Sequence, residues 1–229
     1  MRFTGFSPKG IEFLDNLRKN NRRKWFLKHK SEYQENLYEP FKALVAELMP
    51  TMEGIDSDLV TEPHRAVSRI YRDTRFTKNK LPYRSAMWFS FHRRMLDWKD
   101  APVFFMEISL SGYQYGMGFY QAQPTTMMKF RKFVDFYPED FLNAISFFNK
   151  KHFCVDGDYY KRRVENVHPA SVQPFYQAKT FFLTHVAEHD QILFSRRILS
   201  VLKRNFESLK PLYDFLWRAK QWKIDDSRK

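Results

Sequence analysis

The spacing of apolar residues changes twice along this chain, and that change constrains the fold more than any other feature. Up to about residue 52, apolar side chains recur every three or four positions, which is typical of amphipathic helices. Between residues 86 and 121 they alternate, as in half-buried strands. From residue 125 the helical spacing returns. This order predicts a single α+β domain over residues 1–229, with a central antiparallel sheet of about four strands flanked by N-terminal and C-terminal helices.

The helical parts carry recognisable start and stop signals. Ser7 is a good N-cap, Pro8 suits the first helical position, and Asn20-Asn21 ends the first helix. Pro40 is placed in the same way at the start of another helix. The expected helices cover residues 7–20, 22–38, 40–52, 125–136, 138–148, 175–188 and 195–217, and the last is one helix or a pair divided at Pro211.

The expected strands follow one another closely. They cover residues 66–71, 86–92, 103–110 and 114–121. Short connections between the last three predict an antiparallel meander. Residues 150–174 are expected to be irregular, because Gly157 and Pro169 interrupt them, and residues 220–229 are expected to form a frayed tail.

Positive charge is concentrated in two short segments. The chain has 39 Lys and Arg against 26 Asp and Glu, a net charge of +13. Residues 18–30 hold seven basic residues and no acid, and residues 65–84 hold seven basic residues and one acid, so the rest of the chain is formally neutral. Such focused charge indicates an anionic partner, although a solvated basic face would give the same pattern.

Two groups of residues resemble a known family. The first group is F-S-P over residues 6–8, N-N-R over 20–22 and W-F over 25–26. The second is S-R-I-Y-R-D-T-R-F over residues 68–76, which continues to P-Y at 82–83. They resemble DUF2461, a widespread uncharacterised family with the signature RIxRDxRFSxDKxPYK. This chain departs from the signature at three positions, where Thr77, Asn79 and Arg84 replace Ser, Asp and Lys. The resemblance extends over most of the chain, and it implies a shared fold and no particular activity.

The central signature has the chemistry of an anion site. Arginine binds phosphate or carboxylate through paired hydrogen bonds, lysine adds a point charge, and an aspartate among them stays ionised and holds the arginines in place. The rings of Tyr71 and Tyr83 are suited to stacking on a base or sugar. The predicted anion-binding residues are Arg69, Arg72, Asp73, Arg75, Lys78, Lys80, Tyr83 and Arg84, with Arg22, Arg23 and Lys30 as candidates for its border.

Three functions remain open on this basis. The first is a binding protein for a phosphate-bearing partner, either nucleic acid or a phosphorylated small molecule. The second is an enzyme for a small anionic substrate, with Asp73, Tyr83 or Glu107 as acid–base group. The third is a structural or protein-interaction domain, in which ion pairs among Arg72, Asp73 and Arg75 lock a loop onto the sheet.

The remaining motifs predict no metal and no cofactor. H-x-x-E-H over residues 185–189 would place two histidines one helical turn apart, but a third ligand is missing and a chance match is the better interpretation. A single cysteine, Cys154, excludes a disulfide framework and a thiolate zinc site. Residues 1–9 contain no apolar run, and the apolar stretches are too short to span a bilayer, so no membrane partner and a cytoplasmic location are expected.

Overall fold

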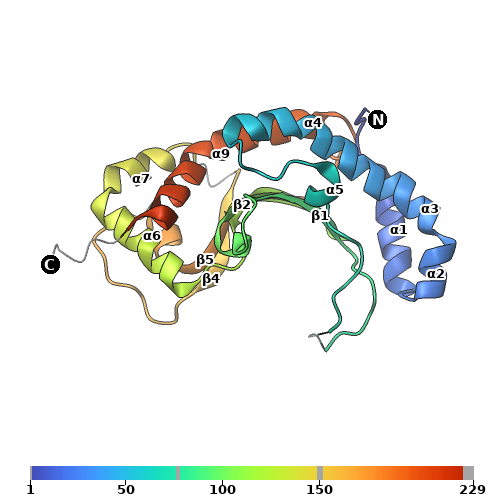
Figure 1. The fold of residues 1–229 in the computed structure, drawn as a ribbon, viewed down its shortest axis with the longest axis horizontal. Coiled ribbons are helices and arrows are strands. Elements are labelled where there is room, and N and C mark those ends of the chain that lie inside the picture. The colour runs from blue at the N-terminus through green and yellow to red at the C-terminus, as the bar shows by residue number, and fades with distance from the viewer. Residues whose placement is uncertain (1, 76–77, 149–151, 224–229) are drawn as a thin grey trace. The chain divides into compact units, whose positions relative to one another are not determined.

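A five-stranded antiparallel sheet forms the centre of the fold, in the order β1-β2-β3-β5-β4. The computed structural model describes residues 2–75, 78–148 and 152–223 (Figure 1). The strands are β1 (Met87–Phe91), β2 (Pro102–Ile108), β3 (Tyr113–Phe119), β4 (Cys154–Tyr159) and β5 (Ala178–Ala187). The α+β class and the meander of the first three strands are therefore confirmed. In β1 the predicted alternation holds, because Met87, Phe89 and Phe91 are buried while the residues between them are half-exposed.

Helices precede, interrupt and follow the strands. Their bounds are α1 (Pro8–Lys19), α2 (Arg23–Lys28), α3 (Lys30–Tyr33), the π-helical turn η1 (Gln34–Tyr38), α4 (Glu39–Ile55), α5 (Pro63–Ala66), the 3-10 turn η2 (Trp98–Asp100), α6 (Pro124–Phe136), α7 (Pro138–Ala144), α8 (Gln173–Tyr176) and α9 (Arg197–Gln221). The Ser7 cap is as predicted, since its hydroxyl accepts a hydrogen bond from the backbone N–H of Lys9 at 3.2 Å.

The helix expected over residues 22–38 is interrupted. It consists of α2, α3 and η1, because the backbone leaves helical geometry at His29 (φ −109°, ψ 18°). By contrast, α9 runs through Pro211 as one helix rather than a pair. It includes Lys220 and Gln221, and residues 224–229 of the expected tail lie outside the described residues.

One expected strand and most of one expected helix are not formed. Residues 66–71 form no strand, because that segment makes only the isolated bridges Val67 to Phe89 and Tyr71 to Tyr83. A helix is expected over residues 175–188. Only the short helix α8 (Gln173–Tyr176) forms there, and residues 178–187 form the strand β5. The strand is favoured because Phe181 and Leu183 are buried at two-residue spacing and the run is rich in Thr, Phe and Val.

A further strand lies in the region expected to be irregular. β4 pairs antiparallel with β5, from Cys154 opposite Thr184 to Tyr159 opposite Ala178, with a shift of register after Asp158. It is an edge strand whose residues are exposed or half-exposed, so its sequence lacks the apolar alternation of a buried strand. Residues 160–172 are irregular as predicted, whereas residues 150–151 lie outside the described residues. Side chains hold this part of the chain, with the Asp135 carboxylate accepting from the Tyr176 hydroxyl (3.0 Å) and from His168 Nε2 (2.7 Å).

The contacts of the chain divide it into two compact units. Unit 1 comprises Met1–Phe91, Phe105–Tyr115 and Val186–Arg204, and unit 2 comprises His92–Phe104, Gly116–His185 and Asn205–Lys229. The interior of unit 1 includes an aromatic group around Phe26, and that of unit 2 a group around Phe141 and Phe215. The organisation as one domain stays a prediction. Among the described residues, no helix is long and apolar enough to cross a membrane.

Candidate functional site

The predicted site lies on the long loop of residues 67–86 in unit 1, which Figure 1 shows between α5 and β1. The two arms of this loop run antiparallel. The Arg72 N–H donates to the Pro82 carbonyl at 2.8 Å, and the Arg84 N–H donates to the Ile70 carbonyl at 2.9 Å. Nearer the sheet, the Ser68 hydroxyl accepts from the Trp88 N–H at 3.1 Å. The segment 67–72 is therefore a strand-like arm rather than a regular strand.

Asn21 fastens this loop to the end of α1. Its side-chain Nδ2 donates to the Tyr83 carbonyl, and its Oδ1 accepts from the Tyr83 N–H, both at 3.0 Å. The Tyr83 ring is 1% exposed and stacks on Phe26 of α2, with centroids 4.4 Å apart. These contacts bring the two basic segments, residues 18–30 and 65–84, against each other.

The environment of Tyr83 makes it a supporting residue. Burial raises the pKa of its hydroxyl, the neighbouring Tyr71 adds to this rise, and the charge of Arg23 opposes it. The influence of Arg23 places a cation of the first basic segment beside the second. Because Phe26 and Tyr71 cover its ring, Tyr83 holds the loop in place and does not present its ring to solvent.

Asp73 and Arg75 form a closed ion pair on the loop. Arg75 Nε and Nη2 donate to the two carboxylate oxygens of Asp73 at 3.0 and 2.8 Å, and the Arg75 N–H donates to the same carboxylate at 3.1 Å. Both side chains are largely exposed. Hydrogen bonds from the Arg75 side chain and then its backbone lower the pKa of Asp73 to about 2. The pair therefore stabilises a local turn of the loop.

We expect this carboxyl to titrate well below its ordinary value of 3.8, with a midpoint at about 2. Because the pKa is lowered in the folded protein, the contribution of the pair to folding is present above the ordinary value and is lost as the pH falls towards 2. The measurement is a carboxyl-carbon NMR titration of Asp73. In Arg75→Gln the midpoint should return towards 3.8, and a midpoint near 3.8 in the unaltered protein would contradict the closed pair.

The other basic residues of the predicted site differ in how they are held. Lys80 Nζ donates to the Thr74 carbonyl at 2.9 Å. The Arg84 guanidinium donates to the Arg69 carbonyl at 3.3 Å and lies 4.6 Å from the centre of the Trp88 ring. These two side chains brace the loop.

Arg69 and Lys78 are exposed, and neither has an ion pair with any described residue. Arg72 is half-buried, and its Nε is buried with no hydrogen-bond partner among the described residues. The predicted site therefore divides into residues whose side chains hold the loop and three cations, Arg69, Lys78 and Arg72, whose side chains make no such contact with a described residue. Phe76 and Thr77 of the signature lie outside the described residues.

Most cations of the first basic segment also have no carboxylate partner among the described residues. Arg18 and Lys19 both bind Asp15, at 2.8 and 2.5 Å. The remaining basic residues are exposed and make no ion pair with a described residue; they are Arg22, Arg23, Lys24, Lys28 and Lys30. Because Asn21 and Phe26 of the same segment contact Tyr83, these cations lie on the part of unit 1 that carries the loop.

The acid–base candidates have little of what catalysis requires. Asp73 is engaged with Arg75, and with a pKa of about 2 it is a weak base at neutral pH. Tyr83 is buried. The Glu107 carboxylate accepts a hydrogen bond from Gln114 Nε2 at 3.1 Å. These surroundings give the enzyme hypothesis no specific support.

The histidines of the H-x-x-E-H motif have different partners. His185 lies in β5 rather than on a helix, and its Nδ1 donates to the His152 carbonyl at 2.6 Å. His189 follows the strand, and its Nε2 donates to the Ser109 carbonyl at 2.9 Å. The expected helical spacing is therefore wrong. In the part of the chain that the structure describes, no cluster of His, Cys, Asp or Glu is arranged to hold a metal ion.

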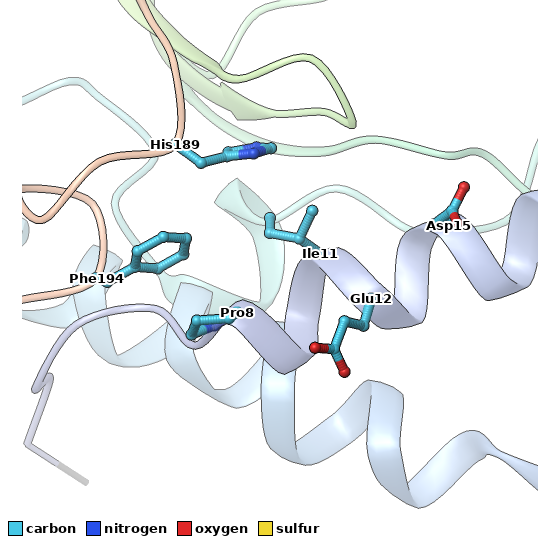
Figure 2. Close-up of a pocket in the computed structure, with 6 residues that line it drawn as sticks. All are labelled: Pro8, Ile11, Glu12, Asp15, His189 and Phe194. Carbon is cyan, nitrogen blue, oxygen red and sulfur yellow. The ribbon is translucent and has the colours of Figure 1, made fainter.

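A small pocket lies elsewhere in unit 1 (Figure 2). Its volume is about 360 Å³, and it is lined by Pro8, Ile11, Glu12, Asp15, His189 and Phe194. His189 already donates to Ser109, and Asp15 already binds Arg18 and Lys19. The pocket shares no residue with the predicted anion site.

Sequence reasoning missed the role of Asn21 and understated that of Phe26. The sequence predicts only that Asn21 helps to end the first helix, and it assigns Phe26 no role in the site beyond its place in W-F. Their positions within N-N-R and W-F were the available signal, because both motifs belong to the resemblance. The contacts with Tyr83 show that the two parts of the resemblance, residues 6–26 and 68–83, meet in unit 1.

The fold and this loop define an α+β protein with a braced, strongly basic loop beside its N-terminal helices. The model of the family described as conserved hypothetical protein (DUF2461) matches residues 9–215, and the chain belongs to this family. No curated protein matches the chain.

Proposed function

We propose that the protein binds a phosphate-bearing partner through a basic surface made by the 67–86 loop and residues 22–30. The observation that carries this proposal is the junction of the two basic segments at Asn21, Phe26 and Tyr83. Residues 18–30 and 65–84 together carry the whole net charge of the chain, and these contacts hold them against each other. Their positive charges repel, which destabilises this arrangement. An anionic partner offsets that repulsion.

The chemistry of the surface suits phosphate. Arg69 and Arg72 carry guanidinium groups that donate paired hydrogen bonds to phosphate oxygens. Lys78 and the lysines of residues 22–30 add exposed point charges. A buried donor without an acceptor, such as Arg72 Nε, usually costs about 1–3 kcal/mol, and an acceptor oxygen of a ligand would offset that cost.

A purely structural role accounts for only part of the loop. The Asp73–Arg75 pair, Lys80, Tyr83 and Arg84 make the contacts that fasten it. Arg69 and Lys78 make no ion pair with a described residue, so loop fastening gives no reason for their charge. A braced scaffold that displays further cations is the arrangement expected of a binding surface.

The test is binding of labelled nucleic acid and of inorganic polyphosphate, measured by anisotropy or competition over a salt series. Binding should weaken steeply with salt, because each phosphate contact releases counterions. Arg69→Ala and Arg72→Ala should weaken binding and lower the slope of log K against log salt by about one each. Arg204→Ala removes the same charge from an exposed position of α9 outside both basic segments and is the matched control.

Arg72→Lys keeps the charge and separates a binding effect from a folding effect. Binding that survives near physiological salt and falls for Arg69→Ala but not for Arg204→Ala supports the proposal. Equal effects of Arg69→Ala and Arg204→Ala, or no binding of either polyanion above low salt, would overturn it. The charge would then serve the fold or a contact with another protein.

A further inference from the structure

We infer that the phosphate-bearing partner is a single-stranded nucleic acid, one base of which stacks on the exposed ring of Tyr71. This inference rests on the proposed function and names the partner class of the same surface. Its basis is an exposed aromatic ring set among cations on a braced arm of the loop.

Tyr71 combines exposure with support from behind. It is 53% exposed, whereas Tyr83, its bridge partner on the other arm, is 1% exposed. Its ring lies 5.2 Å from that of Tyr83 and 5.8 Å from that of Phe26, measured between centroids. Two buried aromatic side chains therefore limit the movement of an exposed one. A ring fixed in this way loses little conformational entropy when a base stacks on it.

The burial pattern places a cation on the same side of the arm as this ring. Arg69 and Tyr71 are exposed, while Ile70 between them is buried at 1% exposure. In an extended segment, residues two apart point to the same side. Arg69 and Tyr71 thus offer a phosphate contact and a stacking surface on neighbouring positions. A nucleotide carries both complementary groups.

The α2 helix adds further charge near the aromatic group. Phe26, which contacts both tyrosines, belongs to α2, and exposed Arg23 and Lys24 lie on the same helix. Arg23 is close enough to influence the pKa of Tyr83. The ring of Tyr71 therefore belongs to a group of aromatic residues to which both basic segments contribute, and each segment has exposed cations.

This combination favours a single strand over a duplex. In a duplex, each base already stacks on its neighbours, so a surface ring meets sugar and phosphate but no free base face. In a single strand, a base is free to stack on an aromatic side chain while the backbone follows the cations. A phosphorylated small molecule would use the cations but would not need the neighbouring basic residues of α2.

The experiment compares ligands that have the same phosphates and differ in their bases. Labelled oligo-dT and oligo-rU of about 12 nucleotides, a length within usual single-strand site sizes, are titrated with the full chain at fixed salt. An abasic oligonucleotide of the same length keeps the phosphates without the bases, and a duplex of the same length keeps the bases in their own stack. We expect the two single strands to bind more tightly than the abasic oligonucleotide and the duplex. The relative affinity of oligo-dT and oligo-rU shows whether the surface prefers DNA or RNA.

The variants isolate the ring. Tyr71→Ala should weaken binding of the single strands by about 5- to 150-fold, since a base–aromatic stack is worth about 1–3 kcal/mol. It should leave binding of the abasic oligonucleotide unchanged. Tyr71→Phe should bind as the unaltered protein does, and Tyr71→Leu serves if the alanine variant is unstable. Tyr120→Ala removes a tyrosine of unit 2 that is 59% exposed and should have no effect.

The outcomes separate this inference from the proposed function. If single strands and the abasic oligonucleotide bind equally well and Tyr71→Ala affects neither, the anion surface stands and the stacking inference is overturned. Tighter binding of the duplex would overturn it as well. If none of these ligands binds above low salt but polyphosphate does, only the inference of a nucleic acid is overturned; if polyphosphate fails as well, the proposed function itself fails.

Discussion

Asp100→Ala should lower the free energy of unfolding by about 3–5 kcal/mol, the usual loss when one partner of a buried ion pair is removed. Asp100 is 8% exposed and belongs to unit 2. Its carboxylate accepts from the Gln123 N–H at 2.6 Å, from the Thr126 hydroxyl at 2.7 Å and from Lys220 Nζ at 2.9 Å. Alanine leaves all three donors without this acceptor. The measurement is urea unfolding followed by tryptophan fluorescence.

Asp97 provides the matched control for this variant. It contacts the same Lys220 Nζ at 3.2 Å, but its side chain is 58% exposed. Asp97→Ala should therefore change the free energy of unfolding by less than about 1 kcal/mol. Similar losses of unfolding free energy in the two alanine variants would show that neither the burial of Asp100 nor its hydrogen bonds to Gln123 and Thr126 add to stability. Asp100→Asn, which keeps an acceptor oxygen, should lie between them.

The fold class was predictable where local spacing and packing agree. The Ser7 hydroxyl caps α1 by accepting from the N–H of Lys9, two residues further along the chain. The residue type that predicts this cap and the contact that forms it therefore lie in the same short segment. The strands β1, β2 and β3 follow each other with short connections, and Met87, Phe89 and Phe91 alternate with half-exposed residues. Neither feature depends on a distant part of the chain.

The strands β4 and β5 could not be predicted in the same way. Both owe their structure to pairing, since Cys154 of β4 faces Thr184 of β5. Apolar residues near 181–183 fit a helix or a strand when taken alone, and the exposed residues of β4 fit a loop. The partner strand decides between these alternatives, and it is remote in sequence.

The candidate site shows the same division. Its charges are visible in the sequence, because residues 18–30 and 65–84 carry the whole net charge. Its organisation is not, because Asn21 and Tyr83 are 62 residues apart and only folding brings them together. Exposure also separates Tyr71 from Tyr83, which the sequence alone treats as equivalent aromatic residues.

Phe26→Ala should both destabilise the protein and weaken binding of polyanions, although it removes no charge. Phe26 is 1% exposed and contacts Tyr33 and Tyr83, with centroid distances of 5.5 and 4.4 Å. Truncating a buried phenylalanine typically costs about 3–5 kcal/mol. Because Phe26 also packs against Tyr71, its loss frees the two basic segments to move apart. The measurements are urea unfolding and polyanion titration at a temperature where the variant is folded.

Leu27→Ala tests whether these effects come from the junction. Leu27 is the next residue of α2 and is 55% exposed, so its truncation should change the free energy of unfolding by less than about 0.5 kcal/mol and leave polyanion binding unchanged. A Phe26→Ala protein that is destabilised yet binds polyanions normally would mean that each basic segment acts alone. A parallel loss of stability and binding would mean that the aromatic junction, and not the number of cations, makes the anion surface.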